Sequence, residues 1–261
     1  MIDLCLAGGL GRMGRVIAGL VQADPDFRIV SVWETRQAIE EAGAYAETAC
    51  YTKNPVKVVS RAQDAVDSSG VVLDFSFPEA FPDLVKACEK ASKPLVTGTT
   101  GIEGKERMLA QLAGRVAVVS APNMSVGVNA LLGICGDLSR TLGKHADAEI
   151  IEIHHRGKKD LPSGTALEIG RVLAANAGKR VVVGRTVGGV VGADEIVIHS
   201  LRTGDVPGTH TVVLSLKGEA LEITHRALSR ECFASGALRA ARFVARARPG
   251  LYSMRDVIAS A

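Results

Sequence analysis

The stretch EIHHRGKKDLPSGTAL, from Glu152 to Leu167, combines residue types suited to proton transfer and to anion binding. His154 and His155 end a β-branched run, and imidazoles exchange protons near neutral pH. Cationic side chains follow at once: Arg156, Lys158 and Lys159. This order predicts a site for a small anion beside a proton donor.

A helix start is expected directly after these cations. Pro162 disfavours helix at Leu161, and Ser163 is a good N-cap for the run GTALEIGRVLAANA. The N–H groups at Gly164 and Thr165 would then lack partners inside the helix and favour a carboxylate or phosphate. Ser163, Gly164 and Thr165 are therefore the predicted contacts of this anion at the helix start.

Two plainer interpretations of the same residues stay open. Adjacent strand residues point to opposite faces, so only one histidine of the pair can share a face with a given lysine. The other would then be packed or solvated. A Lys-Lys-Asp run is also typical of a solvated loop.

A glycine turn near the N-terminus predicts a nucleotide site. Gly8, Gly11 and Gly14 follow the first strand-like run and open a helical one, with Leu10 where the common dinucleotide fingerprint has its second glycine. Glu34 ends the next strand-like run, where an acid can accept hydrogen bonds from ribose hydroxyls. Ordinary turn glycines and a solvated acid would give the same pattern.

Two more loops follow strand-like runs in this half: TGTTG from Thr97 and APNMS from Ala121. Ligands of open α/β sheets bind beyond the carboxyl ends of the strands, so both loops are candidates to hold the nicotinamide and its ribose. The expected contacts of NADH or NADPH are Gly8, Gly9, Leu10, Gly11, Arg12, Met13, Glu34, Gly98, Thr99, Thr100, Ala121, Pro122, Asn123 and Met124.

The surrounding elements define an α/β protein with two domains. Before Pro122, short β-branched runs alternate with amphipathic helical stretches, which predicts a Rossmann-type parallel sheet covered on both faces; the segment 35–61 is less regular. After it come a long helix, the strand DAEIIEIHH, a second helix and the strands EIVIHSLRT, THTVVLSLK and EALEITHRA, the last two joined at Gly218-Glu219. Successive strands predict a mixed sheet in a central α+β domain, and a final helix from Ser229 is expected to return to the first domain.

Composition excludes several classes of protein. The net charge is +3 with dispersed basic residues, which argues against a nucleic-acid tract or a polybasic membrane patch. No apolar run is long enough for a membrane span, and no basic segment precedes an apolar N-terminal run as in a signal peptide. The five cysteines are far apart, without metal-ligand spacing, which favours buried thiols in a reducing cytoplasm and no metal.

The run EIIEIHHRGKKDLPSGTA, residues 149–166, resembles the signature of the 4-hydroxy-tetrahydrodipicolinate (dihydrodipicolinate) reductase family. Similar segments extend along the chain: AGGLGRMGR, DFSFPEA, VTGTTG, APNMSVGVN, LRTGDVPGTHTV, GEALEITHRALSR and GLYSMRDVI. The resemblance implies reduction of a cyclic dicarboxylic acid to tetrahydrodipicolinate in diaminopimelate and lysine biosynthesis. It implies His154 as proton donor or acceptor, Lys158 as second donor, and substrate contacts from His155 and the Gly164-Thr165 backbone.

The resemblance also implies a domain layout and an assembly. Residues 1–124 with 229–261 would bind the dinucleotide, and residues 125–228 would bind substrate and assemble a homotetramer. Some members carry an aromatic residue in place of Met124, and some carry arginine in place of Thr35, where this chain has Arg36 one position later. The preference for NADPH over NADH therefore stays open.

Two other functions share parts of this pattern. A phosphorylating semialdehyde dehydrogenase would share the first half but needs a nucleophilic cysteine, and none lies in an evident catalytic loop. A non-catalytic nucleotide sensor would keep the glycine turn but has no need for His154, Lys158 and the Ser163 helix start together.

Overall fold

The computed structural model describes residues 1–43, 56–184 and 192–260, and they form two compact units. The first unit is 1–125 with 231–261, and the second is 126–230. Cys50 and the rest of residues 44–55, within the segment that lacked a regular pattern, lie outside the described residues. Within the described part, no helix is long and apolar enough to span a membrane.

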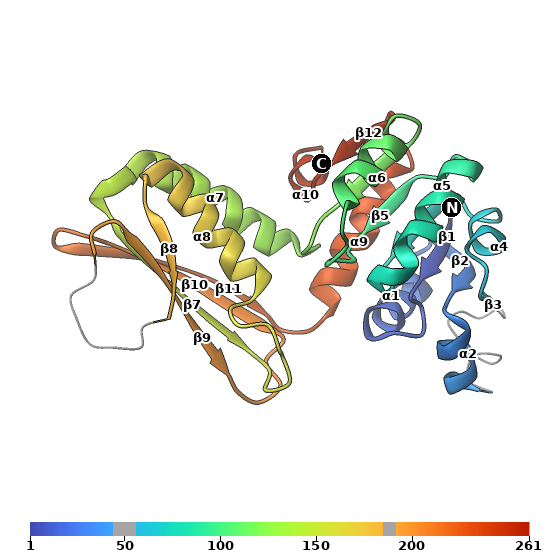
Figure 1. The fold of residues 1–261 in the computed structure, drawn as a ribbon, viewed down its shortest axis with the longest axis horizontal. Coiled ribbons are helices and arrows are strands. Elements are labelled where there is room, and N and C mark those ends of the chain that lie inside the picture. Colours follow the sequence, from blue (N-terminus) through green and yellow to red (C-terminus); the bar gives the residue numbers. More distant parts are fainter. Residues whose placement is uncertain (44–55, 185–191, 261) are drawn as a thin grey trace. The chain divides into compact units, whose positions relative to one another are not determined.

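The first unit is built on a parallel sheet whose described strands have the order β12-β6-β5-β4-β1-β2-β3 (Figure 1). The strands are β1 (Ile2–Ala7), β2 (Phe27–Trp33), β3 (Lys57–Val59), β4 (Val71–Asp74), β5 (Leu95–Thr97), β6 (Ala117–Ser120) and β12 (Gly250–Tyr252). The helical segments are α1 (Arg12–Ala23), α2 (Arg36–Ala42), α4 (Ala62–Val66), η1 (Pro78–Ala80), α5 (Phe81–Ala91), α6 (Lys105–Ala113), α9 (Glu231–Val244) and α10 (Met254–Ala259).

Alternation along β1 shows how helices cover both faces of this sheet. Leu4 and Leu6 pack in one apolar cluster with α1, α9 and α10, whereas Cys5 and Ala7 pack in a second cluster with α4, α5 and α6. Successive strand residues point to opposite faces, so a strand buried on both sides must be apolar throughout. The predicted Rossmann-type sheet is confirmed. The last long helix, α9, lies in the same unit and packs on this sheet.

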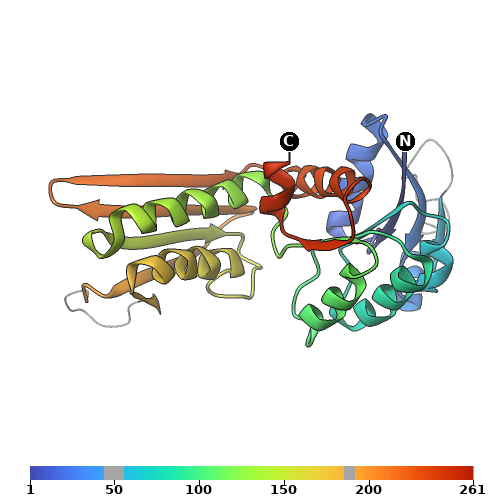
Figure 2. The same cartoon turned by 90° about the horizontal axis from the view of Figure 1, so that it is seen from above.

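The second unit has a mixed five-stranded sheet in its described residues, with strand order β11-β10-β7-β9-β8 (Figure 2). Its elements are α7 (Val126–Leu142), η2 (Gly143–His145), β7 (Asp147–His154), α8 (Gly164–Ala177), β8 (Arg180–Val183), β9 (Glu195–Arg202), β10 (Gly208–Leu216) and β11 (Glu219–Ala227). Ile150, Ile198 and Val212 face α7 and α8, which lie side by side over this face.

The structure differs from the predicted elements in several details, of which the hairpin turn and two short strands are examples. The hairpin between β10 and β11 turns at Lys217-Gly218, because Leu216 already pairs with Glu219, and Gly218 takes the positive φ of +85° that such a turn needs. Strands β8 and β12 were not predicted. Both are short, and neither carries an alternating pattern of its own that could reveal a strand.

Candidate active site

The C-terminal end of strand β7 carries Glu152 and His154 on the helix-covered face of the second sheet. Along β7 every second residue is buried: Ala148 and Ile150 lie in the core, and Glu152 and His154 continue the same face. Glu152 is fully buried and His154 is 7% exposed. Because period-two alternation fixes this face, His155 points away from it, and it is half-buried in the loop that follows.

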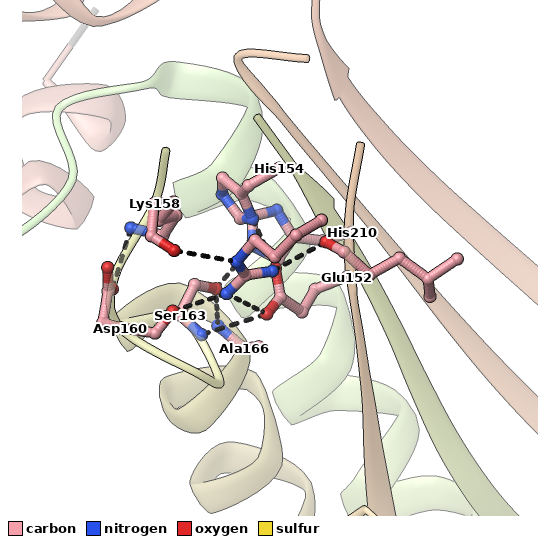
Figure 3. Close-up of polar contacts among 9 residues, drawn as sticks. Glu152, His154, Lys158, Asp160, Ser163, Ala166 and His210 are labelled. Carbon is pink, nitrogen blue, oxygen red and sulfur yellow. Dashed lines mark hydrogen bonds and ion pairs between the residues drawn. The ribbon is translucent and has the colours of Figure 1, made fainter. Parts of the chain in front are cut away.

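Glu152 is held by three different elements (Figure 3). Its Oε2 pairs with His154 Nδ1, and its Oε1 accepts from the Ser163 backbone N–H at 3.2 Å and from an Arg202 Nη at 2.9 Å. Burial by itself raises the pKa of Glu152, but the hydrogen bonds from His154 and Arg202 outweigh it and lower that pKa to about 2. The carboxylate is therefore ionised at every pH at which the protein would work.

Strand pairing brings Arg202 and His210 to this carboxylate from distant parts of the chain. Arg202 of β9 lies opposite His154, and His210 of β10 lies opposite Glu152. The His154 and His210 rings meet edge to face with centroids 5.2 Å apart. Burial, followed by the positive charge of His154, lowers the pKa of His210 from 6.5 to about 3, so His210 stays neutral.

Ser163 starts α8 as predicted and joins it to the histidines. Its Oγ accepts from the backbone N–H of Ala166 at 3.2 Å and lies 3.1 Å from His210 Nε2. Gly164 is exposed and Thr165 half-buried in the first helical turn. The helix N-terminus with its partial positive charge is thus fixed beside His154, as an anion site requires.

The two loop lysines differ in environment. Lys158 Nζ pairs with Asp160 at 2.8 Å, and its carbonyl accepts from Arg202 Nε at 3.3 Å, while Arg202 also donates to the carbonyl of Asp160. Lys159 and Arg156 are exposed. The structure therefore anchors the backbone at Lys158 to the same arginine that binds Glu152.

Glu152, His154 and His210 are metal-ligand types whose donor atoms lie within 4.8 Å of one another. Arg202 contacts the same carboxylate at 2.9 Å, and its positive charge opposes a divalent cation there. The cluster is better suited to orienting a proton than to holding a metal ion.

Glu152, Arg202 and His210 were not among the site residues predicted from the sequence. Glu152 could have been found, because it lies two positions before His154 on a strand with strict alternation. Arg202 and His210 follow much later in the chain, and only the pairing of β7 with β9 and β10 brings them to the site.

In the first unit, the glycine turn has the close packing that a dinucleotide fingerprint needs. Gly8 has a φ of +79°, and a side chain there would lie 2.4 Å from the carbonyl oxygen of Phe75. At Gly14 a Cβ would lie 2.4 Å from the carbonyl oxygens of Gly8 and Gly9, so α1 rests directly on the turn. Gly11 is the N-cap of α1, followed by the first helical residues Arg12 and Met13.

Glu34 lies at the same turn. Its Oε1 accepts a hydrogen bond from the Leu10 backbone N–H at 2.7 Å, and it is 4% exposed. Burial raises the pKa of this carboxyl above its ordinary value. Strand β2 ends just before it, and Thr35 caps α2, so the chain turns at the position predicted for the ribose contact.

The two further loops meet beyond the carboxyl ends of β4, β5 and β6. The buried Asp74 accepts from Thr97 Oγ1 at 2.7 Å, Gly98 N–H donates to the carbonyl of Asp74 at 2.9 Å, and Lys105 donates to the carbonyl of Thr99. Thr100 is exposed. These hydrogen bonds therefore anchor the TGTTG loop to this edge of the sheet.

In the APNMS loop, the side chains of Asn123 and Met124 are turned to contacts within the protein, which leaves mainly the backbone to contact a ligand. Ala121 N–H donates to the carbonyl of Thr97 at 3.2 Å, and Asn123 Oδ1 accepts from Ser125 N–H at 2.9 Å. Pro122 lies between them. The Met124 side chain is 2% exposed in the core with α9 and α10, so it is packed away rather than presented for stacking.

Among the described cysteines, none has the environment of a nucleophile. Burial raises the pKa of Cys5 to about 12 and that of Cys135 to about 11, and it also raises those of Cys88 and Cys232. A thiolate is the reactive form, so these residues do not support a phosphorylating semialdehyde dehydrogenase.

Two family models cover the chain. The model described as dihydrodipicolinate reductase, N-terminus, matches residues 2–124, and that described as dihydrodipicolinate reductase, C-terminus, matches residues 127–258. The chain belongs to the dihydrodipicolinate reductase family. The predicted family and its reductase class are thereby confirmed.

Similar proteins agree with this membership. The chain is 43% identical to the 4-hydroxy-tetrahydrodipicolinate reductase of Rubrobacter xylanophilus, over 100% of this chain and 99% of that protein. It is 41% identical to the enzyme of the same name from Hahella chejuensis, over 99% of each. A dipicolinate-bound dihydrodipicolinate reductase from Paenisporosarcina sp. TG-14 has the same fold, with a TM-score of 0.77, 21% identity and coverage of 97% of each chain.

Proposed function

We propose that this family member reduces 4-hydroxy-tetrahydrodipicolinate to tetrahydrodipicolinate with NADH or NADPH, in diaminopimelate and lysine biosynthesis. The observation that carries the proposal is the buried Glu152–His154 pair beside the capped start of α8. It combines a proton donor with an anion site, as reduction of a cyclic dicarboxylate demands. The substrate loses water, and the ring then gains a hydride from the cofactor and a proton.

In this reaction each site residue has a separate task. His154 supplies the proton for the carbon that becomes electron-rich when the hydride arrives, with Lys158 as the second donor. His155 and Ser163 with the N–H groups of Gly164 and Thr165 hold the carboxylates. These assignments are supported by burial at His154 and by the α8 cap at Ser163.

The first unit is proposed to bind the dinucleotide, which supplies the hydride. Support comes from the close packing at Gly8 and Gly14 and from Glu34 at the same turn. The loops from Thr97 and Ala121 would contact the nicotinamide and its ribose. NADH and NADPH are both expected to be used.

The second unit is proposed to bind substrate and to assemble a homotetramer in the cytoplasm. Its sheet has one face covered by α7 and α8; on the other, Ile151, Ile153 and Val213 are half-buried and Leu201 is 45% exposed. Pairing such apolar faces would remove them from water. Sedimentation of the native protein and of Leu201→Glu tests this: a monomeric native protein contradicts it.

The activity is tested by following NAD(P)H absorbance when the protein is mixed with freshly formed product of pyruvate and aspartate semialdehyde condensation. The expected result is oxidation of the cofactor that depends on both precursors and is lost in His154→Gln. A mixture without pyruvate is the control. No oxidation by the folded native protein would overturn the proposal.

A further inference from the structure

We infer that Glu152 is a positioning residue that fixes His154 as its Nδ1–H tautomer, so that Nε2 is the atom that exchanges a proton with the substrate. The inference deepens the proposed function and rests on the role given there to His154. It assigns a task to a buried carboxylate and to Arg202, which holds that carboxylate in place.

In the contact between Glu152 and His154, the imidazole is the hydrogen-bond donor. Glu152 is fully buried and carries no proton, because hydrogen bonds lower its pKa to about 2. A carboxylate without a proton only accepts, so His154 Nδ1 must carry the hydrogen in the contact between them. In the neutral ring Nε2 then has a free lone pair, and in the charged ring Nε2 carries the transferable proton.

Contacts to both oxygens fix the orientation of the Glu152 carboxylate. Its two oxygens have separate partners: Oε2 faces His154, while Oε1 accepts from Arg202 at 2.9 Å and from Ser163 N–H at 3.2 Å. A partial rotation of the carboxylate would weaken all of these contacts together. The Ser163 contact also ties it to the start of α8, so one residue sets both the imidazole and the anion-binding helix end.

The space beside Nε2 of His154 depends on Gly208. Gly208 begins β10 beside His154, and a Cβ at this position would lie 3.0 Å from Nε2 and 3.3 Å from Cδ2. Because Gly208 has no side chain, the space beside His154 Nε2 stays open. The neighbouring His210 is neutral and directs its Nε2 toward Ser163 Oγ, so it does not compete as a proton donor.

The decisive experiment reads the tautomer directly. Protein labelled with ¹⁵N-histidine carries six histidines, and His154→Gln identifies the signals of His154. At pH 8, native His154 is expected as Nδ1–H. In Glu152→Gln the amide can donate to Nδ1, so the Nε2–H form should appear. A native ring in the Nε2–H form would overturn the inference, and this measurement needs no turnover.

Kinetics supply the second measurement. Glu152→Gln is expected to lower kcat by at least about 10²-fold while the KM for substrate changes by less than about 3-fold. The matched control is Glu168→Gln, which removes one carboxylate from the exposed face of α8 in the same unit. Native kcat in Glu152→Gln would overturn the positioning role.

Gly208→Ala provides a variant that leaves Glu152 intact. It should lower kcat by obstructing Nε2 while the tautomer of His154 stays Nδ1–H, and full activity in it would overturn the assignment of Nε2. If the native enzyme fails to oxidise NAD(P)H, the proposed function falls, whereas the tautomer measurement still decides whether Glu152 orients His154.

Discussion

The Oε1 atom of Glu34 accepts a hydrogen bond from the backbone N–H of Leu10 at 2.7 Å. This bond joins the end of β2 to the turn that follows β1. One acid therefore shapes the glycine turn that is proposed to bind the phosphates, and it lies where the ribose of a dinucleotide is expected. Its negative charge favours ribose hydroxyls and repels a 2′-phosphate.

From this arrangement we expect NADH to be used at least as well as NADPH, with activity on both. Arg36 is exposed at the first position of α2, two residues beyond Glu34, where it can offset the repulsion. Arg36→Ala should raise the KM for NADPH by about 10-fold and leave that for NADH unchanged. Arg28→Ala, at the other end of β2, is the control, and a strong native preference for NADPH contradicts the weight given to Glu34.

Lys158→Ala should lower turnover by about 10²- to 10⁴-fold, the usual cost of losing a proton-transfer group. Lys159→Ala should stay near the native rate, because Lys159 is exposed whereas Lys158 is 24% exposed beside Asp160. Steady-state kinetics of the two variants checks this. Equal losses at both lysines would contradict the assignment of Lys158.

Acid should weaken the fold through His210. Its pKa is lowered to about 3 in the folded protein and is near 6.5 when unfolded, so between these values the unfolded chain binds the additional proton. Stability is complete above pH 6.5 and falls as the pH drops below it, by about 2 kcal/mol at pH 5. Glu152 adds its loss only below its ordinary pKa of 4.5.

Urea unfolding of the native protein and of His210→Asn between pH 7.5 and 5 measures how much His210 contributes to the pH dependence of the free energy of unfolding. The variant should show a shallower pH dependence, although His225, whose pKa burial also lowers, keeps part of it. His145→Gln removes an exposed histidine and should keep the native slope. Identical slopes in the native protein and His210→Asn would show that His210 is not held neutral.

Gly14 and Gly19 lie on the same helix and should respond oppositely to alanine. A Cβ at Gly14 would lie 2.4 Å from two carbonyl oxygens of the glycine turn, while at Gly19 nothing lies within 4 Å. Gly14→Ala should cost about 1–3 kcal/mol and most of the nucleotide affinity. Gly19→Ala should gain about 0.5–1 kcal/mol. Thermal melts and calorimetric titration with NADH check both, and equal effects would contradict the packing at Gly14.

Local sequence patterns were sufficient to predict the turn, the strand end and the helix start that carry the two candidate sites. The turn at Gly8, the end of β2 before Glu34 and the cap at Ser163 each follow from residues adjacent in sequence, whose conformational preferences act over one or two turns. The helix from Gly164 was predicted for the same reason, and it begins at that residue.

The partners of Glu152 could not be predicted in this way, because they depend on which strands pair and in what register. Arg202 faces His154 through parallel pairing of β7 with β9, and His210 faces Glu152 through antiparallel pairing with β10. A shift of one residue would turn each side chain to the other face. Short strands such as β12 also gain their conformation from a neighbouring strand, here β6.

The placement of α9 has a consequence for the order in which the chain can fold during synthesis. Ala234, Ala237 and Leu238 complete the apolar cluster that α1 and β1 begin, yet more than half of the chain separates them from α1. Domains fold as units as they leave the ribosome. The continuous second unit can therefore fold first, while the surface of α1 that receives α9 stays exposed until α9 emerges from the ribosome.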